Sequence, residues 1–134
     1  MAIEFVLDTH ALVWFVTGDA RLGAQARAVM SDPAVQMLLP VTALAEACYI
    51  VDRGRTSIPT PLDLFKALRG DKRIRIAPLT AAVVRRTLAM SAIPEMHDRQ
   101  IAATALRVID RGGTAVLLTK DASITASGLV PVMW

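Results

Sequence analysis

Residues 3–8 of the chain read IEFVLD, and residues 115–121 read AVLLTKD. Both stretches are short, mostly apolar runs of the kind that form buried strands in a parallel sheet. Asp8 directly follows the first run, and Asp121 closely follows the second. Both carboxylates should therefore lie just past the carboxyl end of a strand. In an open parallel sheet with helices on both faces, that edge is where ligands bind.

Strand-like and helix-like patterns alternate along the whole chain, which predicts an α/β fold. Strands are expected at residues 3–7, 35–39, 74–76, 115–119 and 130–133. Helices are expected at residues 9–17, 23–30, 42–51, 61–68 and 80–91 and from 98 to the glycines at 112 and 113, with a turn at 121–126. The 134 residues contain no repeat, linker or low-complexity segment. We therefore expect one domain spanning residues 1–134.

Composition narrows the classes of partner and compartment. The sequence is 54% hydrophobic but only 4% aromatic, and its formal net charge is +3. This mild charge does not require a nucleic acid, although it favours a polyanionic partner. Twelve of the fifteen basic residues are arginines, which suit forked contacts with phosphate. The single cysteine, Cys48, is expected to be a small core residue. The start of the chain has no signal-like pattern and no segment is long and apolar enough to span a membrane, so a cytoplasmic location is predicted.

Four acidic residues stand out: Asp8, Glu46, Asp98 and Asp121. If they meet, repulsion is on the order of 4 kcal/mol per close pair, and a hard cation such as Mg²⁺ would offset it. For the three aspartates, the plainer interpretation is helix N-capping, which leaves one oxygen free for a metal. Glu46 interrupts a helix that is apolar nearly all round, so its carboxylate must be paired or metal-bound. An arginine or the Tyr49 hydroxyl could be that partner.

Polar and basic residues stand close to these acids in the sequence. Thr9 and Thr119 could orient a metal-bound water, although backbone hydrogen bonding is the more ordinary role, above all for Thr9. Arg99 opposes the dipole of its own helix, so it should pair with a site acid or with phosphate. Basic residues between 66 and 75 could form either a solvated face or a track for a nucleic-acid backbone.

Several short motifs together resemble those of PIN-domain ribonucleases. Residues 8–14 (DTHALVW) resemble the opening of that family, and Glu46, residues 97–105 (HDRQIAATA) and residues 118–121 (LTKD) follow in the family's order. The closing residues 132–134 also fit, so the resemblance covers essentially the whole chain. Residues 94–99 read PEMHDR, where many relatives have Asp-Pro, a small residue and Asp-Arg. This departure bears on substrate access more than on metal binding.

The nearest group in this resemblance is the VapC-type toxins of bacterial toxin–antitoxin pairs. It implies a three-layer α/β/α domain with a central, mostly parallel sheet, and Asp8, Glu46, Asp98 and Asp121 around Mg²⁺ or Mn²⁺. It also implies hydrolysis of RNA phosphodiesters, a homodimer and a small antitoxin that blocks the pocket. Asp8 and Asp98 would be direct ligands, whereas Asp121 could act through water.

Two other functions remain open at this stage. A phosphatase-like or phosphoryl-accepting domain would use Asp8 as nucleophile, but the phosphatase pattern has a second aspartate two residues later, where this chain has His10. A receiver-like domain would need adjacent acids near the first strand's end. Alternatively, the chain is a non-catalytic α/β binding module whose acids serve as helix caps and ion pairs.

Overall fold

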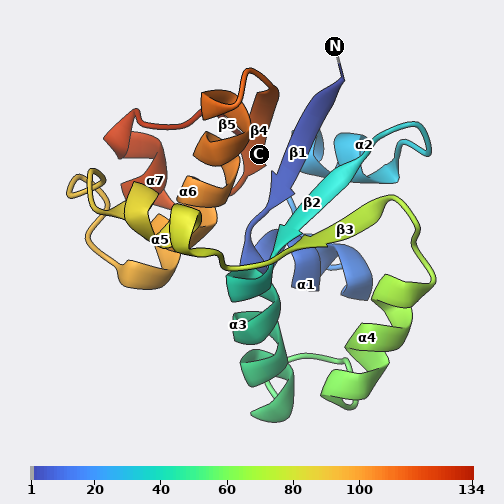
Figure 1. The fold of residues 1–134 in the computed structure, drawn as a ribbon. Coiled ribbons are helices and arrows are strands. Elements are labelled where there is room, and N and C mark those ends of the chain that lie inside the picture. Colours follow the sequence, from blue (N-terminus) through green and yellow to red (C-terminus); the bar gives the residue numbers. More distant parts are fainter. Residues whose placement is uncertain (1) are drawn as a thin grey trace.

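The computed structural model describes residues 2–134 (Figure 1). Its strands are β1 (Ile3–Leu7), β2 (Met37–Pro40), β3 (Ile74–Ala77), β4 (Thr114–Leu118) and β5 (Val132–Met133). Its helices are α1 (Thr9–Thr17), α2 (Ala24–Ser31), α3 (Val41–Asp52), α4 (Pro61–Arg69), α5 (Ala81–Thr87), α6 (Met96–Asp110) and α7 (Ala122–Ser127). The α/β class predicted from the alternation of patterns is confirmed.

The described strands form one sheet in the order β3-β2-β1-β4-β5. Every neighbouring pair is parallel, so the sheet is wholly parallel where a mostly parallel one was expected. β1 and β4 pair along their full lengths, from Ile3 opposite Thr114 to Leu7 opposite Leu118. This pairing places the two strands that precede Asp8 and Asp121 side by side.

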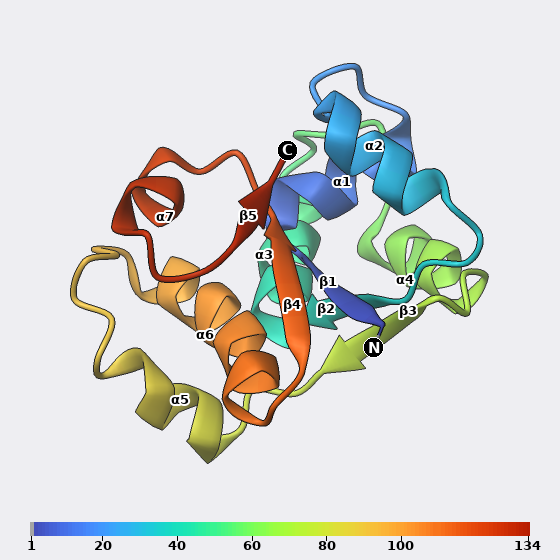
Figure 2. The same cartoon turned by 90° about the horizontal axis from the view of Figure 1, so that it is seen from above.

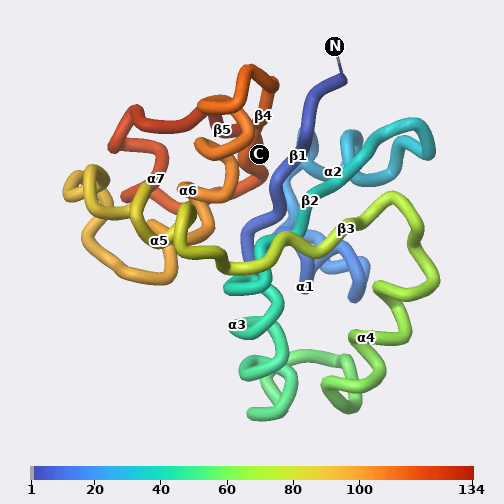
Figure 3. The backbone as a smooth tube through the Cα atoms, in the orientation of Figure 1, coloured from blue at the N-terminus to red at the C-terminus, as the bar shows by residue number. Residues whose placement is uncertain are grey.

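Helices cover both faces of the sheet and give the three-layer arrangement. Figure 2 shows α5, α6 and α7 on one side, with α1, α2 and α4 on the other. Helix α3 continues directly from β2 and projects beyond the carboxyl edge of the sheet (Figure 1). The backbone trace in Figure 3 shows the helical crossovers that return the chain to the start of each parallel strand. Within residues 2–134, no helix has both the length and the apolarity needed to cross a bilayer.

Three helices differ clearly from the sequence expectation. Residues 122–127 form helix α7 instead of a turn, because the Asp121 side chain caps it and Ile124 is fully buried. Helix α6 begins at Met96, two residues earlier than expected, and its N-cap is Glu95, whose side chain accepts from the Asp98 backbone N–H. Helix α5 ends at Thr87, since the following residues turn to bury Met90 and Ile93.

The core lies between the sheet and its helix layers and is built from aliphatic side chains. Leu7, Leu39, Leu117 and Ile101 are all fully buried in it. Cys48, expected inside the core, is half-buried and packs against its edge.

Trp134 packs beside α1, its ring centroid 5.9 Å from that of Trp14. Gly23 makes room for this contact, because a Cβ at position 23 would lie 2.5 Å from Trp134 atoms.

Candidate active site

The four acids of the sequence analysis line one cavity of about 340 Å³, here called the acid cavity. Its wall consists of Asp8, Thr9, His10, Glu46, Ile50, Asp98, Lys120, Asp121, Ala122 and Trp134. The cavity lies at the carboxyl ends of β1 and β4, the edge expected from the sheet topology. The acids come from four different elements or their caps, so only the folded sheet brings them together.

Asp8 is fixed through both carboxylate oxygens. It is the N-cap of α1, where Oδ1 accepts from the Thr9 backbone N–H at 2.6 Å. Its Oδ2 accepts from the hydroxyl of Thr119. Burial raises the pKa of Asp8, and the hydrogen bonds from Thr119 and Thr9 oppose that rise. The capping role is therefore real, and it positions the carboxylate at the cavity.

Glu46 projects from α3, and its Oε1 accepts from the Thr9 hydroxyl at 2.9 Å. Within residues 2–134 it pairs with neither an arginine nor Tyr49, whose side chain is 55% exposed. The Thr9 hydroxyl thus bonds a site acid and not the nearby backbone, contrary to expectation. Burial raises the pKa of Glu46, while the hydrogen bond from Thr9 lowers it. Glu46 is only half-buried, because α3 extends past the sheet edge.

Asp98 lies in the first turn of α6 but does not cap it, because Glu95 fills that role. Among residues 2–134, its carboxylate has neither a hydrogen-bond nor an ion-pair partner. The pKa of Asp98 is raised to about 7, first by burial and then by the negative charges of Asp121, Asp8, Glu95 and Glu46. Asp98 is therefore the acid on which the like charges of the cavity act most strongly.

Asp121 caps α7, where its Oδ1 accepts from the Ile124 backbone N–H at 2.8 Å. Its own backbone N–H donates to the Thr119 hydroxyl oxygen at 3.0 Å. Thr119 is buried, and its hydroxyl joins the carboxylate of Asp8 to the backbone of Asp121. The sequence predicted that Thr119 could orient a metal-bound water; in the structure its hydroxyl donates to the carboxylate of Asp8.

Arg99 does not fulfil the expectation of an ion pair with a site acid. Its Nε donates instead to the backbone carbonyl of Ile93, which secures the segment before α6. The basic run between 66 and 75 contributes no residue to the acid cavity. Two of its arginines are held in ion pairs, Arg73 with Asp71 and Arg75 with Glu4.

Five residues that line this cavity are not among the site residues predicted from the sequence: His10, Ile50, Lys120, Ala122 and Trp134. Lys120 Nζ lies 4.7 Å from the centroid of the Trp14 ring, and His10 packs on the same ring. The position of Lys120 between Thr119 and Asp121 is the one sequence signal that places it near the acids. No local pattern could have placed Trp134 in the wall.

The donor set of the cavity suits a hard divalent cation, because it offers carboxylate and hydroxyl oxygens and no thiolate. Within residues 2–134, no three His, Cys, Asp or Glu side chains lie close enough to hold one ion together. Mg²⁺ commonly keeps several waters and binds through one or two carboxylates. The residues therefore fit a hydrated Mg²⁺ or Mn²⁺ better than a closed cage.

The raised pKa of Asp98, caused first by burial and then by like charges, predicts an unusual dependence of stability on pH. The folded-state pKa of about 7 lies above the model value of 3.8, so the folded protein binds this proton more tightly. The corresponding stabilisation is present at low pH and is lost as the pH rises from 3.8 to about 7. In chelator, Asp98→Asn should remove this part of the pH dependence and raise the melting temperature above that range. Melting curves over pH for both proteins measure the effect, and identical slopes would contradict it.

Comparisons with known proteins identify the family and the fold. A family model described as PIN domain matches residues 5–127. A search of curated protein sequences found no significant match. Among solved structures, the chain is similar to VapC20 of Mycobacterium tuberculosis, which is described as a sarcin–ricin loop cleaving toxin. The TM-score is 0.67 at 20% sequence identity, and the match covers 97% of this chain and 99% of that one.

It is also similar to a chain of VapBC2 from Rickettsia felis, with a TM-score of 0.67, 15% identity and coverage of 98% of both chains. A chain of VapBC from Salmonella typhimurium gives a TM-score of 0.64 at 17% identity, covering 98% of this chain and 97% of that one. These likenesses establish a shared fold. Because the family model also spans most of the sequence, the chain belongs to the PIN-domain family.

Proposed function

We propose that this protein is a metal-dependent endoribonuclease and the toxin of a toxin–antitoxin pair, with residues 1–134 acting as one nuclease unit. The observation that carries the proposal is the gathering of Asp8, Glu46, Asp98 and Asp121 around one cavity at the sheet edge. Membership of the PIN-domain family supports nuclease chemistry at that edge.

A divalent ion bound there would polarise water and offset the charge that builds up on the phosphodiester during hydrolysis. We assign Asp8 and Asp98 as direct ligands, with Asp121 acting directly or through water. The hydroxyls of Thr119 and Thr9 hold Asp8 and Glu46 in orientation for this role. Such outer partners of metal ligands fix ligand geometry.

Glu46 is suited either to the metal or to proton transfer. Its raised pKa and partial exposure favour a carboxylate that can accept a proton from the attacking water. The water oxygen then forms a bond to phosphorus, and the bond from phosphorus to the leaving oxygen breaks. The leaving oxygen takes up a proton from solvent water, and Glu46 returns its proton to solvent, which completes the hydrolysis.

Divalent metal is expected to raise the melting temperature of the protein. Mg²⁺ or Mn²⁺ at about 100 times its Kd should stabilise the fold by about 2.7 kcal/mol, or on the order of 5–10 °C for a protein of this size. The physical reason is that the ion binds the folded acid cavity and offsets the burial and the like charges that raise the pKa of Asp98. Differential scanning fluorimetry in Mg²⁺, Mn²⁺ and chelator measures the shift.

Asp98→Asn should lose most of this metal response. Asp52→Asn, which changes an exposed acid at the end of α3, should keep it and serves as the control. Equal melting temperatures in metal and chelator would favour the alternative of a non-catalytic module whose acids act only as caps and ion pairs.

The partners of the chain are part of the same proposal. Structural neighbours include VapBC complexes from Rickettsia felis and Salmonella typhimurium and a toxin–antitoxin complex from Klebsiella pneumoniae. By analogy, we propose cytoplasmic RNA as the substrate, a homodimer as the assembly and a small antitoxin as the inhibitor.

A further inference from the structure

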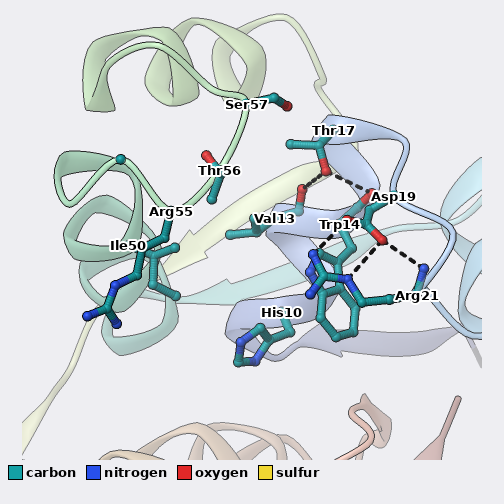
Figure 4. Close-up of a pocket in the computed structure, with 11 residues that line it drawn as sticks. His10, Val13, Trp14, Thr17, Asp19, Arg21, Ile50, Arg55, Thr56 and Ser57 are labelled. Atoms are coloured by element: carbon teal, nitrogen blue, oxygen red, sulfur yellow. Dashed lines mark hydrogen bonds and ion pairs between the residues drawn. The ribbon is translucent and has the colours of Figure 1, made fainter.

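A second cavity of about 570 Å³, here called the flanking groove, adjoins the acid cavity (Figure 4). It lies between α1, the end of α3 and the segment that leads to α4. Its lining includes His10, Trp14, Arg21, Ile50, Arg55 and Ser57. His10 and Ile50 line both cavities, so the two spaces share a wall.

The buried ring of Trp14 organises the basic side chains at this junction. The Arg21 guanidinium carbon and the Lys120 Nζ each lie 4.7 Å from its centroid, and the His10 ring lies 5.0 Å away. Such contacts hold cations over an aromatic face. Lys120 lines the acid cavity, Arg21 the flanking groove, and His10 both. Basic groups therefore continue from the site of the four acids into the groove.

The groove itself is positively charged. Its charged side chains are Arg21, Arg55 and Asp19, which sum to two positive charges and one negative charge, or +1. Arg21 is fixed by Asp19, to which its Nε and Nη2 donate at 3.1 and 2.8 Å, and its Nη1 is not used in this pair. Arg55 is exposed and has no ion pair within residues 2–134. Its guanidinium remains available to an anionic ligand.

The groove also offers hydroxyl groups near its charges. Thr56 Oγ1 accepts from the Ile58 backbone N–H at 3.1 Å, which leaves its own O–H to donate. Ser57 lies next to it on the same lining segment. The volume falls within the range of roughly 300–1,000 Å³ typical of small-ligand sites. This space suits one unpaired nucleotide and not a duplex.

We propose that the flanking groove binds the nucleotide next to the scissile phosphate of a single-stranded RNA, with Arg55 and Arg21 contacting its phosphate. The inference rests on the proposed function, since it assigns the path of the substrate of the acid cavity. An RNA strand whose scissile phosphodiester lies among the acids must continue through a neighbouring space on the protein. The adjoining groove carries cationic side chains along its wall. These side chains would neutralise the RNA phosphates that the acids would otherwise repel.

The test measures binding apart from cleavage. Asp8→Asn protein serves as a cleavage-impaired background, and a short fluorescent single-stranded RNA is titrated by anisotropy at several salt concentrations. Adding Arg21→Ala and Arg55→Ala together should weaken binding roughly tenfold. The slope of log affinity against log salt should become shallower by about 0.7 for each lost phosphate contact. Arg85→Ala, an exposed arginine on α5, is the matched control and should change neither value.

Unchanged affinity and salt slope in the double variant would overturn the inference and would leave the groove to a protein partner. A parallel cleavage assay in Mg²⁺ separates the two proposals. If the unmodified protein cleaves RNA and the double variant has the same KM, the groove assignment alone fails. If the unmodified protein cleaves no RNA but strand binding still depends on Arg21 and Arg55, the nuclease proposal alone fails.

Discussion

Asp8→Asn is expected to lower kcat/KM for RNA cleavage by at least ~100-fold, because removal of even an outer partner of a metal ligand commonly costs 10- to 100-fold. The substitution removes a negative charge at the point where the proposed ion and the phosphodiester meet. Steady-state cleavage of a single-stranded RNA in Mg²⁺ measures the loss.

The same variant should remain folded. Asparagine is as good an N-cap as aspartate, so the hydrogen bond to the Thr9 backbone N–H can persist. Loss of a buried charge also removes the desolvation that raises the pKa of Asp8. Circular dichroism and a melting curve check the fold, and Asp52→Asn is the control for a simple change of charge. Full activity in Asp8→Asn would remove Asp8 from the reaction.

Thr119→Val should lower cleavage by about 10- to 100-fold, the usual effect of losing an outer partner of a metal ligand. Valine keeps the shape of the side chain but cannot donate to Asp8 or accept from the Asp121 backbone N–H. Each buried polar group left without a partner costs about 1–3 kcal/mol, so a lower melting temperature is also expected. Cleavage kinetics and thermal melts of the variant measure both effects.

Two further variants separate the role of the Thr119 hydroxyl from general damage to the core. Thr119→Ser retains the hydroxyl and should recover most of the activity. Thr104→Val removes another buried hydroxyl, which donates to the Gln100 carbonyl within α6, and should leave cleavage nearly unchanged. Wild-type turnover in Thr119→Val would show that Asp8 does not depend on this contact.

The sheet and the meeting of the acids were predictable because both depend on strong local patterns. Apolar runs defined β1 and β4, and parallel pairing then required Asp8 and Asp121 to share an edge. The N-cap of α6 was harder to predict. Glutamate is a weaker capping signal than aspartate, so Asp98 was predicted to be the N-cap in place of Glu95. Helix α7 is short, and the burial of Ile124 by the rest of the fold decides it.

The contacts around the acids could not be predicted from the sequence, for a different reason. The Thr9 hydroxyl bonds Glu46, 37 positions away, and Thr119 bonds Asp8, 111 positions away. Contacts between residues so far apart in the chain produce no periodic pattern in the sequence. Arg99 bonds a carbonyl six residues earlier, which depends on the path of the loop before α6. The exposure of α3 likewise follows from its projection past the sheet, which an apolar composition does not reveal.

The central place of β1, paired with β4 from Ile3 opposite Thr114 onward, has a consequence for biosynthesis. While a ribosome is translating this chain, β1 leaves the exit tunnel long before β4 exists. A nascent polypeptide that stops short of residue 119 lacks both the hydroxyl that holds Asp8 and the acid at position 121. The growing chain therefore cannot assemble the acid cavity until β4 and residue 121 have left the ribosome.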